Sequence, residues 1–513
     1  MIKRTLLVLI SCLIQPTIHA AENDIPPQNV LQITSYADDA SPGTLRWAIL
    51  KNNQHPGNYR IELHTLGKKP YAIKLQQPLP PLMGPVEIIN TDWRKTNDYI
   101  AIDGSGYIKP VDPRACPGAV EGQYGANVRT TSLPGLVLRD TGHVTLQGLE
   151  ITNFCIGILI NRSSDNVIED NRIVANHGGA GLMLTGDDGK GNSTATTTQR
   201  NKILRNTFIN NGDSMEATRG ASFNLIADNF ITTDLVNNKE PSQGLEMLWG
   251  NDNEIIRNHF ENYSDGVQIN WGNRNYIAAN TFVNLSSAVT LSGSGNIVDG
   301  NTMTGNRVAV SVRPQGEAGK DGRFGINRIS GISSNRISEN IMIDNGRNIK
   351  RCFAGGSCLP HLAGAIVFNV PGLEHAAFIG NRGGGISEDT SKMEKICAID
   401  GRVAGCEPTP NEGQTAPHLD RVTLHAGQLS VEGEVKGIAN TLYRIEFFSN
   451  RRADENEAED ILGYQMVAIG ANGQAHFHYQ LTLPARLQVA NVTATATNND
   501  GATSTLSQPA ALR

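Results

Sequence analysis

The sequence has few aromatic residues and no excess of positive charge. Phe, Trp and Tyr make up 5% of its 513 residues, and 44 Lys and Arg stand against 50 Asp and Glu, for a formal net charge of −6. A chain without a basic surplus lacks the electrostatic footprint of a nucleic-acid-binding protein. The 53 glycines suit a chain with many tight turns. We therefore expect no nucleic-acid partner.

A run long enough to span a membrane is also missing. The apolar run near the amino terminus, from Leu6 to Ile14, is short of the roughly 20 residues that a bilayer requires. Two basic residues precede it and small residues follow, so residues 1–21 are predicted to be a cleaved signal peptide. This indicates an exported protein, periplasmic where the host has two membranes. A lipoprotein is the alternative, because the segment ending at Cys12 resembles a lipid-attachment box.

Cysteine spacing typical of zinc sites is missing too. There is no Cys-x-x-Cys and no nearby His pair, so we prefer disulfides to zinc. An even number of cysteines in an exported chain favours disulfides within the chain. Removal of the signal leaves Cys116, Cys155, Cys352, Cys358, Cys397 and Cys406. The last four can close two small loops, Cys352 with Cys358 and Cys397 with Cys406, which leaves Cys116 for Cys155.

A degenerate asparagine repeat runs through the middle of the chain. Its form is Asn, any residue, apolar, two of any kind, Asn, and it recurs at irregular steps of about 21 to 39 residues. The copies are Asn166 to Asn171, Asn201 to Asn206, Asn253 to Asn258, Asn275 to Asn280, Asn296 to Asn301 and Asn335 to Asn340. Asn tolerates left-handed turns between short strands, and stacked Asn side chains hydrogen-bond along the stack. The repeat predicts an all-β fold, a right-handed single-stranded parallel β-helix.

The pattern of residue types along the sequence divides the chain further. Residues 22–135 are expected to form a lead-in with a capping helix near residues 41–50. The coils are expected over residues 136–415, with an irregular, cysteine-bearing end. From residue 416 to 513, alternating apolar and polar residues predict a small β-sandwich, to which the sequence assigns no chemistry.

Aligning one strand from each coil predicts a functional wall. The segments begin at Gly157, Gly181, Ser214, Gly244, Gly266 and Ala288. Their second and fourth positions are nearly all apolar and should point into the core, because strand side chains alternate between faces. The outward third position reads Leu159, Met183, Glu216, Glu246, Gln268 and Thr290. Because adjacent strands lie about 4.8 Å apart, Glu216 and Glu246 should be direct neighbours.

Two such carboxylates cannot both ionise cheaply. One pKa should rise, which suits acid–base catalysis near neutral pH. Arg219 would hold the other carboxylate ionised and bind an anionic substrate. A solvated ion cluster is the plainer interpretation, but exposed stacked tryptophans at Trp249 and Trp271 favour a site.

Further polar residues border the predicted wall. Candidate substrate-binding residues besides the two tryptophans are Gln268, Asn270, Lys190, Arg162, Asp187, Asp188, Tyr263, Asp265 and His177. His177 is also consistent with an ordinary turn residue. Arg313 belongs to a later coil and is expected to lie too far from the predicted wall. Neither a Gly-rich phosphate loop nor a Ser-His-Asp spacing is present.

No cofactor is predicted, although the sequence leaves a divalent metal open. Asp187 and Asp188 follow a strand and would suit calcium. Together with Glu216 and Glu246 they would supply four carboxylates to one ion.

Several longer motifs resemble one family across nearly the whole chain. They include Leu45-Arg-Trp-Ala-Ile49, Asn127-Val-Arg-Thr130, Phe154-Cys-Ile-Gly157, Thr185-Gly-Asp-Asp-Gly-Lys-Gly-Asn192, Leu245-Glu-Met-Leu-Trp-Gly-Asn-Asp252, Tyr263-Ser-Asp-Gly-Val-Gln-Ile-Asn-Trp-Gly272 and Ile349-Lys-Arg-Cys-Phe-Ala-Gly-Gly-Ser-Cys358. The sequence thereby resembles exported 3-dehydroshikimate dehydratases of bacterial quinate and shikimate catabolism. The coil pattern alone resembles the wider group of pectin-lyase-like β-helices.

The resemblance implies that 3-dehydroshikimate loses water and aromatises to protocatechuate. The wall fits this chemistry if Glu216 and Glu246 are acid and base in an unassigned order. Arg219, with Arg162 or Lys190, would bind the carboxylate. Gln268 and Asn270 would orient oxygens, and Trp249 or Trp271 would cover the ring.

Two other functions fit the same pattern. A lyase or epimerase acting on uronate polysaccharides also needs a base, a cation and aromatic platforms. A non-catalytic surface β-helix needs none of these and predicts no raised carboxyl pKa.

Overall fold

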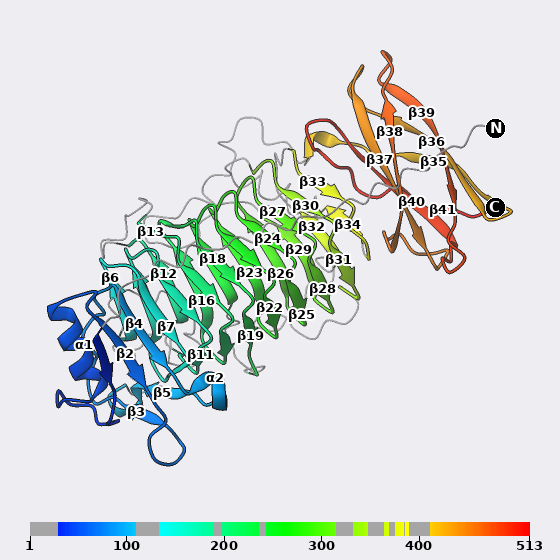
Figure 1. The fold of residues 1–513 in the computed structure, drawn as a ribbon. Helices are drawn as coiled ribbons and strands as arrows, with labels where there is room; N and C mark the ends of the chain where they lie inside the picture. The colour runs from blue at the N-terminus through cyan, green and yellow to red at the C-terminus, as the bar shows by residue number, and fades with distance from the viewer. Residues whose placement is uncertain are drawn as a thin grey trace, which may run out of the picture.

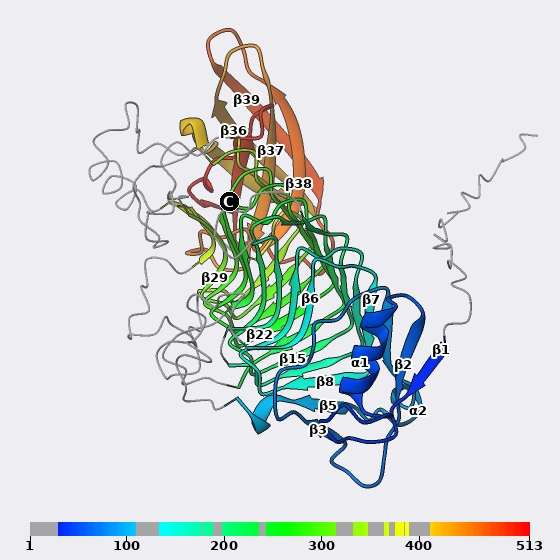
Figure 2. The same cartoon turned by 90° about the vertical axis from the view of Figure 1, so that its left-hand side faces the viewer.

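The fold was analysed in a computed structural model. It describes residues 29–108, 133–177, 179–187, 197–234, 243–313, 332–346, 364–368, 375–383, 385–388 and 411–513. The chain forms a long stack of coils with a second β-rich unit at one end (Figure 1). The amino-terminal helix lies at the opposite end of the stack (Figures 1 and 2).

Three parallel sheets build the stack, and from β6 onward successive coils add strands to all three, whereas the first coils add strands only to the first and second sheets (Figure 2). The first sheet contains β1 (Asn29–Gln32), β2 (Tyr59–Leu63), β4 (Val86–Asn90), β7 (Val144–Gln147), β10 (Val167–Glu169), β14 (Lys202–Leu204), β18 (Leu225–Ala227), β21 (Glu254–Ile256), β24 (Tyr276–Ala278), β27 (Ile297–Asp299), β30 (Arg336–Ser338) and β33 (Ala377–Ile379). The second contains β3 (Ala72–Lys74), β5 (Ile100–Asp103), β8 (Leu149–Thr152), β11 (Arg172–Val174), β15 (Thr207–Ile209), β19 (Phe230–Thr232), β22 (His259–Glu261), β25 (Thr281–Val283), β28 (Thr302–Thr304) and β31 (Ile341–Ile343).

The third sheet, here called the wall sheet, carries the aligned strands. It contains β6 (Pro134–Arg139), β9 (Ile156–Asn161), β12 (Ala180–Thr185), β16 (Asp213–Thr218), β20 (Gln243–Leu248), β23 (Asp265–Asn270), β26 (Ser287–Ser292), β29 (Val308–Val312), β32 (Gly364–Phe368) and β34 (Ile386–Glu388). A short pair, β13 (Thr198–Gln199) and β17 (Ala221–Ser222), lies beside the stack. The predicted parallel β-helix is confirmed.

The coils begin earlier than the predicted boundary at residue 136. Strands β1, β2 and β4 already belong to the first sheet, and β3 and β5 to the second. A helix, α1 (Leu45–Gln54), lies at this end, where the Thr44 side chain accepts a hydrogen bond from the Trp47 backbone N–H. That bond satisfies one of the unpaired donors of the first helical turn. The same region contains the short helices α2 (Trp93–Thr96) and η1 (Gly104–Gly106).

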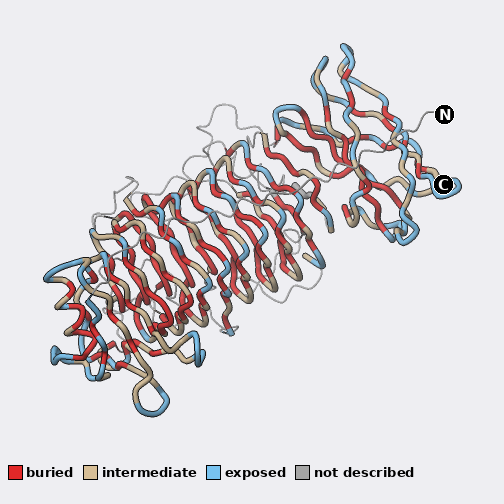
Figure 3. The backbone as a smooth tube through the Cα atoms, viewed as in Figure 1, coloured by how far each residue is buried: buried red, intermediate tan, exposed pale blue. Residues whose placement is uncertain are grey.

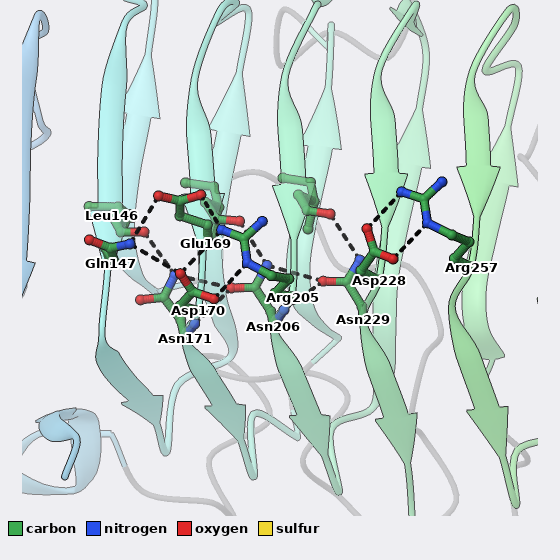
Figure 4. Close-up of polar contacts among 12 residues, drawn as sticks. Leu146, Gln147, Glu169, Asp170, Asn171, Arg205, Asn206, Asp228, Asn229 and Arg257 are labelled. Atoms are coloured by element: carbon green, nitrogen blue, oxygen red, sulfur yellow. Dashed lines mark hydrogen bonds and ion pairs between the residues drawn. The ribbon is translucent and has the colours of Figure 1, made fainter. Parts of the chain in front are cut away.

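Buried asparagines hold successive coils in register (Figure 4). Asn229 Oδ1 accepts from the Asn206 backbone N–H at 2.8 Å, and Asn229 Nδ2 donates to the Ile203 carbonyl at 2.9 Å. Asn171 and Asn206 repeat this arrangement one coil earlier, as the predicted stacking requires. The first of these bonds satisfies the backbone N–H of a turn residue, and the second ties the turn to a carbonyl of strand β14.

The sequence predicts that the asparagines adopt the left-handed conformation in these turns. In the structure the residue before each asparagine adopts it instead. Asp170, Arg205, Asp228 and Arg257 have φ values between 51° and 58°. Their side chains point outward and pair across coils, Arg205 with Asp170 and Arg257 with Asp228 (Figure 4). The asparagines are thus free to bond inside the stack.

Aliphatic and aromatic side chains fill the interior of the coils. Buried residues, red in Figure 3, recur along the backbone of every sheet of the stack. Phe260 and Phe282 stack with ring centroids 5.1 Å apart. A Cβ at Gly244 would lie 2.6 Å from the Phe260 ring, and one at Gly266 would lie 2.5 Å from the Phe282 ring. Glycine is therefore required at the start of these two wall strands.

The carboxy-terminal unit consists of two antiparallel sheets, as predicted. One contains β35 (His418–His425), β36 (Gln428–Lys436) and β39 (Gln474–Thr482); the other contains β37 (Leu442–Asn450), β38 (Asp460–Ala468), β40 (Asn491–Thr497) and β41 (Ala510–Ala511). It contacts the last coil, where buried Glu446 accepts from the Gly380 N–H at 2.9 Å. Asn411, in η4 (Asn411–Gly413), bridges Ala376 and Thr503.

Some predictions concern residues outside the described ranges. These are the signal peptide and every predicted disulfide cysteine except Cys155, which is buried and disulfide-bonded. The predicted pairings therefore stay predictions. In the described part of the chain, no helix has the length and apolar character needed to cross a membrane.

The hydrogen bonds between stacked asparagines, here called the asparagine ladder, predict the effect of a substitution on stability. Asn229→Leu should lower the free energy of unfolding by about 2–4 kcal/mol, because the buried Asn206 backbone N–H loses its acceptor and the Ile203 carbonyl loses one donor. The neighbouring Asp228→Ala removes only a partly exposed ion pair and should cost about 1 kcal/mol or less. Urea unfolding followed by circular dichroism measures both. Equal, small losses would show that the ladder does not stabilise the coils.

Candidate active site

The wall sheet brings the two predicted glutamates side by side. Glu216 on β16 is the register partner of Glu246 on β20, and Glu246 is the partner of Gln268 on β23. Thr290 on β26 follows in the same column. One coil therefore separates the two acidic residues, as the alignment predicts.

Both carboxyl groups lie in a poorly solvated position. Glu216 is 9% exposed. Burial, followed by the nearby charge of Glu246, raises the pKa of Glu216 to about 8, while Arg219 opposes the rise. Burial and then the charge of Asp265 raise the pKa of Glu246 to about 7. The expected rise in pKa is present, but burial rather than mutual repulsion is its larger cause.

A third carboxyl group, missed by the sequence analysis, belongs to the same cluster. Burial, followed by the charge of Glu246, raises the pKa of Asp213 well above its usual value. One Asp213 oxygen accepts from the Gln243 backbone N–H at 2.8 Å. Strict alternation would place Asp213 on the inner face with Met215 and Ala217, but the strand start departs from alternation.

The same departure is visible in the apolar coils before it. Ile156, Leu159, Ala180 and Met183 form one cluster separate from the main core, although the members of each strand are three residues apart. The residue before each aligned segment thus shares a face with the third position. A column of polar residues at that place, Asp213, Gln243 and Asp265, was the signal available in the sequence.

Gln268 links the carboxyl pair to Arg313. With the amide nitrogen facing Glu246, Gln268 Nε2 lies 3.2 Å from Glu246 Oε1, and Gln268 Oε1 accepts from Arg313 Nη2 at 2.9 Å. The prediction that Arg313 lies too far along the coils is wrong, because its long side chain reaches back along the stack.

Arg219 and the two tryptophans lie at the far end of the wall strands. Trp249 and Trp271 stack with centroids 4.5 Å apart and planes inclined by 9°, as predicted, but they are not exposed: Trp271 is buried and Trp249 is half-buried. Arg219 lies 5.5 Å from the Trp249 ring centroid and pairs with Asp187 at 2.9 Å. All three of these strand-end residues have positive φ values, so the turn directs them together.

Arg162 and Asn161 fix the backbone that follows β12. Arg162 Nη1 donates to the Asp187 carbonyl at 2.6 Å, and the guanidinium also pairs with Asp140. Asn161 Nδ2 donates to the same carbonyl at 2.8 Å. Arg162 therefore holds the turn at Asp187. Asn270 is half-buried on β23 and is the register partner of Leu248 on β20.

The two second-rank candidates of the turn before β23 have different positions. Tyr263 was expected to face the substrate, but it is 1% exposed, lies in the main core, and its hydroxyl bonds Ser214 Oγ at 2.6 Å. Asp265 lies beside Glu246 and accepts from Thr290 Oγ1 at 2.9 Å. Its other oxygen is buried and has no hydrogen-bond partner.

The remaining candidates add little to the cluster. His177 is half-buried, and burial lowers its pKa. Asp188 and Lys190 lie outside the described residues, so their predicted roles stay predictions. Among the described residues, no group of three His, Cys, Asp or Glu side chains is arranged to hold a metal.

The fold and this wall define a β-helix protein with a buried acid–base cluster on one outer face. A curated relative, 3-dehydroshikimate dehydratase of Acinetobacter baylyi (strain ATCC 33305 / BD413 / ADP1), is 51% identical over 483 residues, which are 94% of each chain. The chain belongs to the 3-dehydroshikimate dehydratase family. The family described as periplasmic copper-binding protein (NosD) matches residues 125–234, which carry the first asparagine repeats.

Solved structures of similar shape have far lower sequence identity. The periplasmic alginate epimerase AlgG is 12% identical with a TM-score of 0.36, over 64% of this chain and 76% of its own. An exopolygalacturonase from Thermotoga maritima is 13% identical with a TM-score of 0.37, over 69% and 91%. ORF18 of Geobacillus virus E2 is 10% identical with a TM-score of 0.38, over 94% and 76%.

The raised pKa of Glu216 predicts a pH-dependent stability difference. The unfolded carboxyl ionises near 4.5, the ordinary value for glutamate, and the folded one near about 8. The folded state therefore binds the extra proton between these values, and stability falls as pH rises through that window. Glu216→Gln removes this loss, so its stability relative to the wild type should rise by roughly 3 kcal/mol between pH 5 and pH 8.

Urea unfolding at both pH values measures this gain. The exposed Glu254→Gln serves as control and should show the same difference from wild type at pH 5 and pH 8. A Glu216→Gln variant that gains nothing at pH 8 would mean that the Glu216 carboxyl ionises normally.

Proposed function

We propose that this chain removes water from 3-dehydroshikimate to form protocatechuate. The observation that carries the proposal is the register pairing of Glu216 with Glu246, two carboxyl groups whose pKa values burial raises toward neutral pH. The family relative named for this activity supports it. The substrate is then a small molecule, and the wall performs the chemistry.

The reaction needs a base and an acid in adjacent positions. The base takes the proton from the carbon between the ketone and the carbon that bears the leaving hydroxyl, and the electron pair moves to the ketone oxygen as an enolate. The enolate then expels the hydroxyl, which takes a proton from the acid and leaves as water. The ring CH2 then loses a proton, its electron pair shifts through the ring to the ketone oxygen, and that oxygen takes up a proton to give the phenol.

The neighbours of the two carboxyls support an assignment of these roles. Glu246 acts as the base, because the Gln268 amide nitrogen faces its carboxylate and favours the ionised form. Glu216, whose pKa burial raises to about 8, keeps its proton at neutral pH and acts as the acid. A general acid or base works best when its pKa lies near the working pH. Gln268, within hydrogen-bond reach of Glu246, orients the base.

The surroundings of the pair supply the other requirements of the reaction. Asp213 adds a third proton-bearing group and Trp249 offers an aromatic face. The substrate carboxylate needs a cation, and arginines border the pair on two sides, Arg219 at the strand ends and Arg313 beyond Gln268.

We also propose export and intrachain disulfides. The signal-like residues 1–21 support export, as does the periplasmic family that matches residues 125–234. The disulfide-bonded state of Cys155 supports cross-linking of this chain, with Cys116 the proposed partner. The proposed reaction uses no cofactor, so turnover of 3-dehydroshikimate should be the same with and without a chelator.

Replacing either glutamate should abolish most turnover. Glu246→Gln and Glu216→Gln keep the shape of the side chain but remove the ionisable group, so kcat should fall at least about 100-fold in each variant. The assay follows protocatechuate absorbance with purified protein and 3-dehydroshikimate. Glu261→Gln, on a different sheet, is the control and should retain activity.

Near-normal turnover in both variants would overturn the role of the pair. Formation of unsaturated uronates from pectate or alginate by the wild type, with no protocatechuate, would instead identify a polysaccharide lyase.

The pH profile provides a separate test. If Glu246 must be ionised and Glu216 protonated, kcat/KM should rise through about pH 7 and fall through about pH 8, as the pair titrates. This narrow bell-shaped profile of kcat/KM reports the pKa values of the two carboxyl groups in the free enzyme. A flat profile from pH 5.5 to pH 9 would contradict an acid–base pair.

A further inference from the structure

Two arginines lie at the end of the carboxyl column nearest the later coils. Arg307 and Arg313 flank β29, which pairs with β26, and β26 pairs with β23. Arg313 Nη2 nevertheless donates to Gln268 on β23, so the side chain reaches back two strand spacings toward Glu246. Each spacing is about 4.8 Å.

Few protein groups balance the positive charge of Arg313 or accept hydrogen bonds from it. Within the described ranges it forms no ion pair, and its Nε is buried and has no hydrogen-bond partner. Its partner Gln268 is a neutral amide. A guanidinium has five N–H donors in a planar fork that suits a carboxylate, and here several of them are unused.

Arg307 increases the positive potential at this place. It is 5% exposed, and burial lowers its pKa, with a further decrease from the charge of Arg313. The two guanidinium groups therefore lie within electrostatic reach of each other. Asp265 opposes them on one side, and an anion that binds Arg313 would relieve the remaining repulsion.

Arg219, the cation chosen from the sequence, has a different environment. Asp187 Oδ2 lies 2.9 Å from Arg219 Nη1, so a carboxylate of the protein already balances its charge. The guanidinium also lies over the Trp249 ring. A substrate carboxylate would have to compete with both contacts.

We propose that Arg313, held by Gln268, binds the ring carboxylate of the substrate, and that Arg219 does not. The inference rests on the proposed function. In 3-dehydroshikimate the carboxylate is para to the carbon that loses its proton. With that carbon at Glu246 and the ring laid along the column of wall residues, the carboxylate extends past Gln268, where Arg313 lies.

This placement gives Gln268 a double role. Its nitrogen faces the base and its oxygen faces the carboxylate-binding arginine, so one amide sets the distance between the two. Arg219 then acts as a positioning residue, which holds Asp187 and the Trp249 ring and moderates the pKa of Glu216.

Binding of two probes separates the two arginines. Protocatechuate carries the carboxylate, and catechol is the same ring without it. Isothermal titration of the wild type, Arg313→Met, Arg219→Met and the surface control Arg274→Met gives Kd for each probe. In Arg313→Met, Kd for protocatechuate should rise about 10- to 100-fold while Kd for catechol stays within about twofold.

In Arg219→Met both Kd values should change by similar factors, because lost ring positioning does not depend on the carboxylate. Arg274→Met should match the wild type. If Arg313→Met does not fold, Arg313→Gln takes its place and should show the same selective loss. Arg313→Lys, which keeps the charge but not the fork, should show an intermediate loss.

The results also separate this inference from the proposed function. A wild type that makes no protocatechuate from 3-dehydroshikimate overturns the proposed function. A wild type that does, together with an Arg313→Met variant that still prefers protocatechuate over catechol as strongly as the wild type, overturns the role of Arg313 alone. A selective loss in Arg219→Met instead would assign the carboxylate to Arg219.

Discussion

The stacking register of the coils is the constraint on which the rest of the structure depends. Buried asparagines bond to the next coil through side chain and backbone, so that each strand has one possible partner position. A slip of one residue would turn the whole wall inward. The neighbouring positions of Glu216 and Glu246 are a direct consequence, since 30 residues of chain make one turn between them.

Register and burial together produce the chemistry. A solenoid wall places like residues at one strand spacing, and here that spacing brings carboxyl groups together in a place with little water. Ionising them costs free energy, so protons remain bound up to neutral pH. The stabilising ladder on one side of the coils thus supports an energetically costly cluster on another, a common relation between fold and active site.

The sequence predicts the parts that follow from periodicity. The repeat gives the fold, and alternation along the wall strands gives the Glu216, Glu246 and Gln268 column. Three features fall outside that logic. Asp213 lies at a strand start where alternation fails, Tyr263 turns into the core to reach Ser214, and Arg313 reaches along the stack rather than across it. The earliest coils were missed because they lack the asparagine repeat.

The most direct test of the account is a measurement of carboxyl protonation. Infrared difference spectra of the protein, recorded from about pH 5 to pH 9, report the carbonyl stretch of protonated carboxyl groups. The account predicts protonated carboxyls that persist at about pH 6.5 in the wild type, with the signal reduced in Glu216→Gln and in Glu246→Gln. A wild-type spectrum with every carboxyl ionised by about pH 6 would contradict it.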